Sequence, residues 1–222
     1  MTKKITTFLS SLMILASVSA TNVAAEGFTV GFSGMIGMVT ADGTEHERTD
    51  VGDSQKTNHS TGDTFVGGDI FAEYEFANGY AFGVSAVPFD ADIGSGKRTD
   101  TVGTADAGQE TGDRSASAKL TNLYTIYATK SVGSGGTYLL AGFHDGNIEI
   151  TETLPNSTYA DQGVNGIQLG IGHKIETGSG ALRYELSYSD FDDIDVKSST
   201  GATGQKVTAD ADAVYVKIGY SF

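Results

Sequence analysis

The stretch Val214-Tyr-Val-Lys-Ile-Gly-Tyr-Ser-Phe222 decides the fold that we predict for this chain. Every second residue from Val214 to Phe222 is apolar or aromatic, and the residues between them are mixed and polar. An extended strand sends alternate side chains to opposite faces, so this strand has one apolar face and one mixed face. The same two-residue period recurs in other segments of the chain.

The first 25 residues have the three parts of a secretory signal peptide. Two lysines precede a mostly apolar stretch, residues 5–18, and Val23-Ala-Ala25 then offers the small residues that a signal peptidase accepts. The apolar run is too short for a membrane helix, which needs about 20 residues. We predict a signal peptide over 1–25 and one domain over 26–222, with cleavage after residue 20 as the alternative.

Composition limits both the fold and the chemistry. The chain has 30 glycines and 2 prolines, which suits many strands joined by turns better than helices. It has no cysteine, so a disulfide, a thiolate metal site and a thiol nucleophile are excluded. The net charge of −14 becomes −16 when the two leader lysines are removed. Such an acidic protein should not bind nucleic acid, and it should repel anionic head groups unless divalent cations intervene.

Eight segments alternate as strands do, and each is long enough for the roughly 9–11 tilted residues that cross a bilayer. They are about 27–39, 64–76, 79–89, 117–129, 137–150, 163–176, 181–191 and 210–222. Short connections (77–78, 131–136, 177–180) alternate with long ones (about 40–63, 90–116, 151–162, 192–209). We therefore predict an all-β fold: an eight-stranded antiparallel up-and-down transmembrane β-barrel with short periplasmic turns and long extracellular loops.

Most of these strands place charged residues on the face opposite the apolar one. The predicted lumen charge network consists of Asp69, Glu73, Glu75, Lys119, Lys174, Glu176, Arg183, Glu185 and Lys217. Nearly balanced charge suits a narrow lumen filled with ion pairs, because an unpaired buried charge is costly. Eight strands leave an interior that side chains can fill. Residues 137–145 fit either phase.

A soluble, secreted ligand-binding barrel of the lipocalin or avidin kind is the alternative fold. It shows the same alternation with the faces reversed, so that its apolar side chains lie inside. Long connections at one end only favour the membrane barrel, and so do tyrosines near predicted strand ends. These tyrosines are Tyr74, Tyr80, Tyr138, Tyr188 and Tyr220. The absence of tryptophan weakens the argument for an aromatic girdle.

The chain resembles the small outer-membrane barrels of the OmpA-domain, OmpX/Ail, OmpW and opacity-protein type. The resemblance covers 26–222 and rests on topology, on the terminal Tyr220-Ser-Phe222 and on the glycine-rich segment 163–172. It implies location in a Gram-negative outer membrane, with outer-membrane lipid, lipopolysaccharide, periplasmic chaperones and the barrel-assembly machinery as partners. It also implies an assembly signal made of Val214, Val216, Ile218, Tyr220 and Phe222.

Two motifs suggest chemistry, and both have a simpler interpretation. Barrel-embedded lipid A deacylases use a His-x-Ser-Asn stretch, but His144-Asp-Gly-Asn147 has a glycine where the nucleophile belongs, so we interpret it as a chance match. An acidic run could bind Ca²⁺ or Mg²⁺ weakly, although a solvated loop is the simpler interpretation. The run consists of Asp190, Asp192, Asp193 and Asp195. We expect no catalytic residue, no cofactor and no resident metal.

The predicted function is that of a non-enzymatic outer-membrane barrel in envelope integrity and surface contact, with a side-chain-filled lumen. A porin-like channel or an OmpW-like conduit with a lateral opening for small solutes is the alternative, and a soluble ligand-binding barrel is a further one. The lumen distinguishes them. A plugged barrel needs its inward charges to pair, whereas a channel needs a continuous unfilled or apolar path. The near balance of inward charge favours the plug. The sequence identifies no solute or extracellular ligand.

Deleting Phe222 should cripple insertion into the outer membrane and leave secretion intact, because the terminal aromatic residue belongs to the predicted assembly signal. The fraction of folded protein in purified outer membranes, judged by heat-modifiable gel mobility, measures the effect. Ser221→Ala, which alters only the polar face, is the control. Normal insertion of the truncated chain would contradict the prediction.

Overall fold

The structure is a computed structural model. It describes residues 27–46, 56–100, 112–153, 158–198 and 206–222. The predicted signal peptide and its cleavage site lie outside these ranges. Within the described ranges, no helix has the length and apolar character needed to span a membrane.

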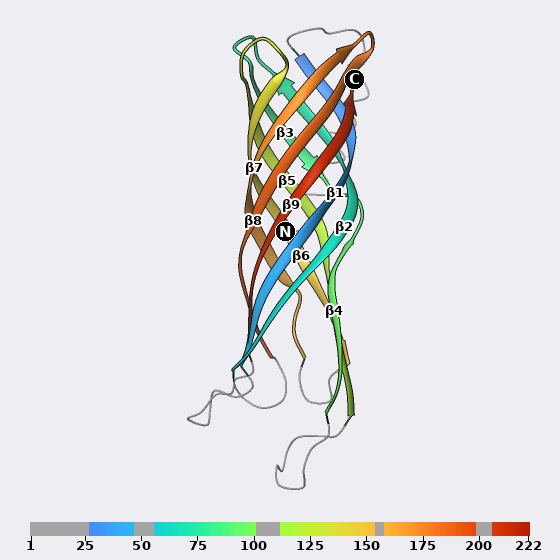
Figure 1. Cartoon of the computed structure of the whole chain (residues 1–222), viewed down its shortest axis with the longest axis vertical. Coiled ribbons are helices and arrows are strands. Elements are labelled where there is room, and N and C mark those ends of the chain that lie inside the picture. The colour runs from blue at the N-terminus through green and yellow to red at the C-terminus, as the bar shows by residue number, and fades with distance from the viewer. Residues whose placement is uncertain (1–26, 47–55, 101–111, 154–157, 199–205) are drawn as a thin grey trace.

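All the strands that the structure describes belong to one antiparallel sheet (Figure 1). They are β1 (Gly27–His46), β2 (Lys56–Glu75), β3 (Tyr80–Ala86), β4 (Ala91–Asp100), β5 (Gly112–Ser131), β6 (Thr137–Thr153), β7 (Gln162–Thr177), β8 (Gly180–Lys197) and β9 (Lys206–Ser221). Their order is β3-β2-β1-β9-β8-β7-β6-β5-β4, and β3 also pairs with β5. This last pairing closes the sheet into a barrel.

The predicted third strand, 79–89, is replaced by two strands. β3 and β4 both pair with β5, so they continue one another along the barrel wall on either side of residues 87–90. Pro88 lies in this interruption. Proline has no N–H to donate to a neighbouring strand and is rarely accommodated inside a sheet.

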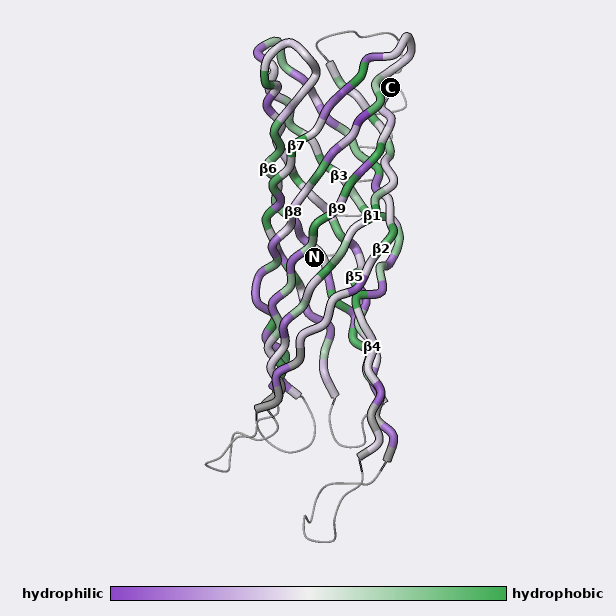
Figure 2. The backbone as a smooth tube through the Cα atoms, in the orientation of Figure 1, coloured by the Kyte–Doolittle hydropathy of each residue, from purple (hydrophilic) through white to green (hydrophobic). Residues whose placement is uncertain are grey.

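Three of the long connections are strand over much of their length, which corrects the prediction of loops there. In the segment 192–209, β8 pairs with β9 as far as Lys197↔Lys206. The β1–β2 ladder runs without a break from Gly27↔Glu75 to His46↔Lys56. In the segment 90–116, β4 pairs with β5 as far as Asp100↔Gly112. These segments are rich in threonine, whose branched side chain favours strands, so they extend the hairpins beyond the apolar part of the barrel. Figure 2 shows this change from green to purple and white along the tubes.

Apolar side chains lie on the outside of the barrel and charged ones on the inside. The outward Val66, Ile126 and Ile36 are 79%, 66% and 61% exposed, whereas the inward Glu73 and Arg183 are 2% and 6% exposed. A lipocalin-type barrel has the reverse arrangement, so the surface of this chain does not fit that alternative.

The structure settles the phase of residues 137–145. Tyr138, Leu140 and His144 are buried inside, while Leu139 and Phe143 face outwards. Tyr138 therefore does not belong to the predicted girdle of tyrosines. The neighbouring β5 has a register shift between Thr121 and Tyr124, which disturbs the simple alternation there.

Inward aromatic rings lie across glycines on neighbouring strands. The sheet register pairs Phe71 with Gly31, Tyr127 with Gly83, Tyr138 with Gly172 and Tyr215 with Gly37. A Cβ at Gly31, Gly83 or Gly172 would collide with the ring opposite, and a Cβ at Gly37 would collide with the Cβ of Tyr215 and the ring of Phe65. The glycines thus leave room for large side chains to lie flat against the wall of a narrow lumen.

Gly172→Ala should destabilise the folded barrel by about 1–3 kcal/mol, the usual cost of overpacking. The new methyl group must displace Tyr138, whose hydroxyl donates to Glu185 at 3.0 Å. Gly163→Ala on the same strand is the control, because no atom lies within 4 Å of its Cβ position. Urea unfolding in lipid vesicles measures both variants. Equal stability of the two would contradict the packing argument.

Candidate functional site

The lumen has two levels with different chemistry. Charged and hydrogen-bonded side chains fill the level nearer the short turns, which we call the plug. An apolar cavity, which we call the chamber, lies nearer the long connections. Glu73, close to the turn-side end of β2, belongs to the plug, whereas Phe65, eight residues earlier in the same strand, lines the chamber.

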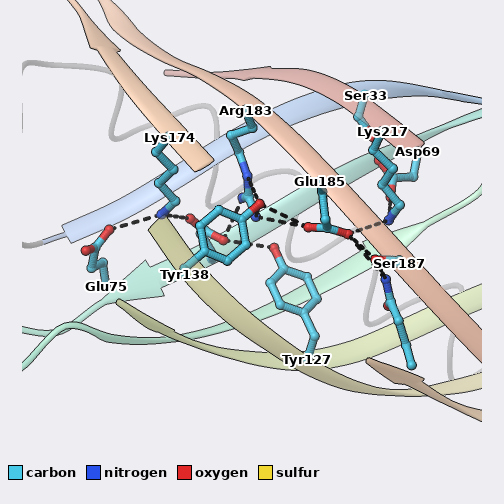
Figure 3. A network of polar contacts seen from close by, with 12 residues as sticks. Ser33, Asp69, Glu75, Tyr127, Tyr138, Lys174, Arg183, Glu185, Ser187 and Lys217 are labelled. Atoms are coloured by element: carbon cyan, nitrogen blue, oxygen red, sulfur yellow. Dashed lines mark hydrogen bonds and ion pairs between the residues drawn. The ribbon is translucent and has the colours of Figure 1, made fainter. Parts of the chain in front are cut away.

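Glu73 is the centre of the plug, and Figure 3 labels its partners Lys174, Arg183 and Tyr127. Its carboxylate accepts hydrogen bonds from Lys174 Nζ at 2.7 Å, Arg183 Nη1 at 2.8 Å and the Tyr127 hydroxyl at 3.1 Å. These donors come from β7, β8 and β5, so the carboxylate on β2 ties distant parts of the barrel wall together. Lys174 Nζ also contacts Glu75 Oε2 at 3.1 Å.

Glu185 is the second centre. It accepts from the Tyr138 hydroxyl at 3.0 Å, from Ser187 Oγ at 2.8 Å and from Gln168 Nε2 at 3.3 Å. Lys217 Nζ lies 3.8 Å from Glu185 Oε1 and 2.8 Å from Asp69 Oδ2. Ser33 also donates to Asp69.

The plug is nearly neutral and nearly solid. Four carboxylates (Asp69, Glu73, Glu75, Glu185) face three cations (Lys174, Arg183, Lys217), a sum of −1. A cavity of about 20 Å³ among these side chains has room for roughly one water molecule. Side chains therefore block the lumen at this level.

The structure brings seven of the nine predicted lumen charges together in the plug. The other two, Lys119 and Glu176, lie elsewhere. Lys119 is half-exposed, and its Nζ lies 3.7 Å from the exposed Asp92. Glu176 is exposed beside a short turn.

Sequence reasoning missed the uncharged members of the plug. They are Ser33, Tyr127, Tyr138, Gln168 and Ser187. The two-residue period puts Ser33, Gln168 and Ser187 on the polar face of their strands, so a search that included uncharged polar residues would find them. The two tyrosines lie on the strands whose alternation is disturbed.

The chamber has a volume of about 130 Å³ and mostly apolar walls. Its apolar lining comes from Met35, Val39, Phe65, Val66, Val87, Phe89, Ala91, Ile93, Leu120, Leu123, Ile148, Val164, Phe191, Ile194, Ala211 and Ala213. An apolar path was the feature that the sequence analysis required of a conduit. The chamber provides one in the outer half of the lumen only.

The chamber lies against an unpaired seam in the wall. β2 pairs with β3 only from Ile70↔Ala86 towards the turn. Beyond that point the described pairings join β2 to β1 and β4 to β5, and none joins β2 to β4. The rims of this seam contribute Val66 and Phe89, which are 79% and 70% exposed and also line the chamber. In Figure 1 the β1–β2 and β4–β5 hairpins end apart.

A chain of four polar side chains forms the floor of the chamber, and we call it the floor chain. Thr125 Oγ1 lies 2.8 Å from His144 Nδ1, His144 Nε2 lies 2.8 Å from Ser189 Oγ, and Ser189 Oγ lies 3.0 Å from the Tyr215 hydroxyl. All four residues line the chamber.

The Ser189–His144 contact joins a hydroxyl to an imidazole, but it lacks other parts of a nucleophilic site. The second ring nitrogen of His144 meets the Thr125 hydroxyl rather than a carboxylate that would stabilise an imidazolium. Ser189 is 1% exposed. The sequence could not identify this pair, because Ser189 is 45 residues away and β7 lies between the two strands.

The acidic run in β8 shows no geometry for a cation. Among the described residues, no group of three histidine or acidic side chains could hold a metal ion. Asp195 instead pairs with Lys206 Nζ at 2.8 Å.

No protein-family model matches the chain, and no curated protein has significant sequence similarity to it. Solved structures of outer-membrane proteins are similar in shape over most of their length. OprG from Pseudomonas aeruginosa is 15% identical, with 86% of this chain and 95% of that chain covered and a TM-score of 0.46. AlkL is 14% identical over 91% and 92% of the two chains, with a TM-score of 0.43.

Ail of Yersinia pestis is 14% identical over 89% of this chain and 99% of that one, with a TM-score of 0.38. None of these similarities is close enough to transfer a function.

Glu185→Ala should raise ion conductance and lower stability by about 3–5 kcal/mol, because it removes acceptors from buried donors and leaves Lys217 less well paired. Single-channel recording in planar bilayers measures the conductance. Glu176→Ala, which removes an exposed carboxylate outside the plug, is the matched control. Unchanged conductance in folded Glu185→Ala would show that Glu185 is not part of the barrier.

Proposed function

We propose that this protein is a non-enzymatic outer-membrane β-barrel that admits small apolar molecules to its chamber from outside and releases them sideways into the bilayer. The single observation that carries the proposal is the apolar chamber beside the unpaired seam between β2 and β4. The plug beneath the chamber closes the direct route through the lumen.

The outer surface supports a location in lipid. Large apolar side chains from β1, β3 and β5 to β9 are about half exposed, and a water-soluble surface rarely carries so much contiguous apolar area. The pairing of β3 with β2 and β5 closes the turn-side half of the barrel, where each strand has a neighbour on both sides, and lipid requires backbone groups to be satisfied in this way. The short turns then face the periplasm and the long hairpins face outwards. Outer-membrane lipid and lipopolysaccharide are the expected surroundings, and the barrel-assembly machinery with periplasmic chaperones is the expected route there.

The seam explains why a molecule would leave sideways. A closed ladder presents no gap to lipid, but β2 has no described partner on this side beyond Ile70. Apolar side chains on the two rims make the opening compatible with acyl chains and with an apolar solute. One rim of the seam is attached to β5 by a backbone hydrogen bond. The Val87 N–H donates to the Leu123 carbonyl at 2.9 Å.

A role in envelope integrity and surface contact is the second candidate. The observation that favours it is the plug, whose paired charges need no transport function to explain them. The two candidate functions predict different effects of filling the chamber with a larger side chain. If the protein is a conduit, the passage of a small molecule slows; if it has only an envelope role, the passage is unchanged.

Ala213→Leu should slow the entry of naphthalene into vesicles with an outer leaflet of lipopolysaccharide. Ala213 is buried on β9 and lines the chamber, so three further carbon atoms reduce the space that the solute needs. The fluorescence of naphthalene on transfer from water to lipid, followed by stopped flow, gives the rate. We expect the rate to fall close to that of protein-free vesicles.

Val214→Leu is the control, because Val214 is the next residue on the same strand and faces outwards. It should leave the rate unchanged. If Ala213→Leu, inserted to the same level, admits naphthalene as fast as wild type, the conduit is wrong and the envelope role is preferred. Wild-type protein should show no ionic conductance in either case, since the plug is intact.

A further inference from the structure

The floor chain is separate from the plug. Its members come from β5, β6, β8 and β9, and the described hydrogen bonds join them to one another and not to the plug. Ser189 and Ser187 lie two residues apart on β8, and Ser187 bonds to Glu185 and Gln168 of the plug. The floor chain is thus a separate hydrogen-bonded layer that faces the apolar chamber, and the plug touches it through Lys217 Nζ, which lies 5.6 Å from the centre of the Tyr215 ring.

The floor chain always has one more hydrogen than its own bonds use. Threonine, serine and tyrosine each carry one O–H, and a neutral imidazole carries one N–H, so there are four donors. Three contacts join the four groups, and each uses one hydrogen. Whichever way the bonds point, one donor is left over. A charged imidazolium would add a second.

The spare donor is best placed at an end of the floor chain. If Thr125 donates to His144, the bonds run on to Tyr215, and the phenolic O–H is free. If they run the other way, the Thr125 hydroxyl is free. Both ends line the chamber. A hydrocarbon covering the floor leaves this donor unsatisfied, whereas an oxygen acceptor satisfies it, and an unsatisfied buried donor is costly.

The floor does not suit a charged ligand. The two ring nitrogens of His144 contact hydroxyl groups, and its ring stacks on Phe191, so it offers no charged partner. Lys217, the cation that lines the chamber, already pairs with Asp69 at 2.8 Å and lies 3.8 Å from Glu185. An anion would lose its hydration without gaining an unpaired cation.

The size of the chamber limits the ligand further. Cavities of about 150 Å³ hold one benzene ring, so this chamber of about 130 Å³ has room for about one ring, and the rest of a larger molecule must lie in the seam beside it. We propose that the floor chain is a hydrogen-bond-donating subsite that selects small, uncharged molecules carrying one oxygen acceptor over hydrocarbons of the same size. This inference rests on the proposed function, since it names the class of molecule that the chamber admits.

The experiment compares two ligands of one shape in protein embedded in lipid nanodiscs. 4-Fluoroacetophenone has a carbonyl acceptor and 4-fluorotoluene has none, and ¹⁹F NMR titration gives both affinities after correction for partition into empty nanodiscs. We expect wild type to bind the ketone about tenfold more tightly, equivalent to about 1.4 kcal/mol. Thr125→Val/His144→Phe/Ser189→Ala/Tyr215→Phe, which we call the donor-free variant, removes all four donors and should bring the ratio close to one, with the affinity for fluorotoluene retained.

Thr129→Val/Tyr188→Phe is the matched control. It makes the same Thr→Val and Tyr→Phe changes at a buried residue of β5 that does not line the chamber and at an outward tyrosine of β8, and it should keep the tenfold ratio. Ser189→Ala is a second test. It divides the floor chain into a Thr125–His144 pair and a lone Tyr215, which leaves two spare donors, so the ketone preference should persist. A purely structural role of the floor chain predicts a loss instead.

The outcomes separate this inference from the proposed function. If wild type binds both ligands equally, or if the donor-free variant keeps the tenfold ratio, the floor does not select and the inference is wrong, while the conduit stands. If wild type binds neither ligand and Ala213→Leu does not slow naphthalene, the conduit is wrong and the inference falls with it. Heat-modifiable gel mobility establishes that each variant is folded, and Ser189→Ala supplies the test if the donor-free variant is not.

Discussion

The contact between Glu73 and Arg183 is the constraint on which the rest of the lumen depends. The two residues are 110 positions apart in sequence, and β1 and β9 separate their strands in the sheet order. A charge inside this narrow barrel has little water to solvate it, so it needs a partner across the lumen. Glu73 also accepts hydrogen bonds from Lys174 and Tyr127, so the loss of its carboxylate would leave several buried donors without an acceptor. The plug is therefore stable as a unit rather than as separate pairs.

The plug also decides what the remainder of the lumen can do. Because charged side chains close the turn-side half, a molecule in the chamber can return outwards or leave through the wall. The wall is weakest where Pro88 interrupts the pairing of β3 with β2 and the chain continues as β4. A solid plug and an open seam are thus complementary. A barrel with the plug alone needs no seam, and one with the seam alone would leak ions.

The sequence predicted the fold and most of the plug, because a two-residue period carries through β2, β7, β8 and β9 and assigns each charge to a face. It failed where that period breaks. The register shift near Asn122, whose φ is +52°, left the phase of β5 and β6 open and with it the positions of Tyr138 and His144. The hairpin extensions were missed because threonine- and glycine-rich segments resemble loops in composition. The floor chain joins strands far apart in sequence, a contact that no local pattern indicates.

Apolar walls and polar floor contribute differently to recognition. The walls provide affinity that scales with the area covered, so they scarcely distinguish one small molecule from another of similar size. A hydrogen-bond donor at a fixed position does distinguish them. It binds a molecule that carries an acceptor, and it is left unsatisfied by a molecule that has none. The floor chain has a spare donor because its four donors share three contacts. Selectivity in this barrel would then come from a hydrogen-bond count rather than from the shape of the chamber.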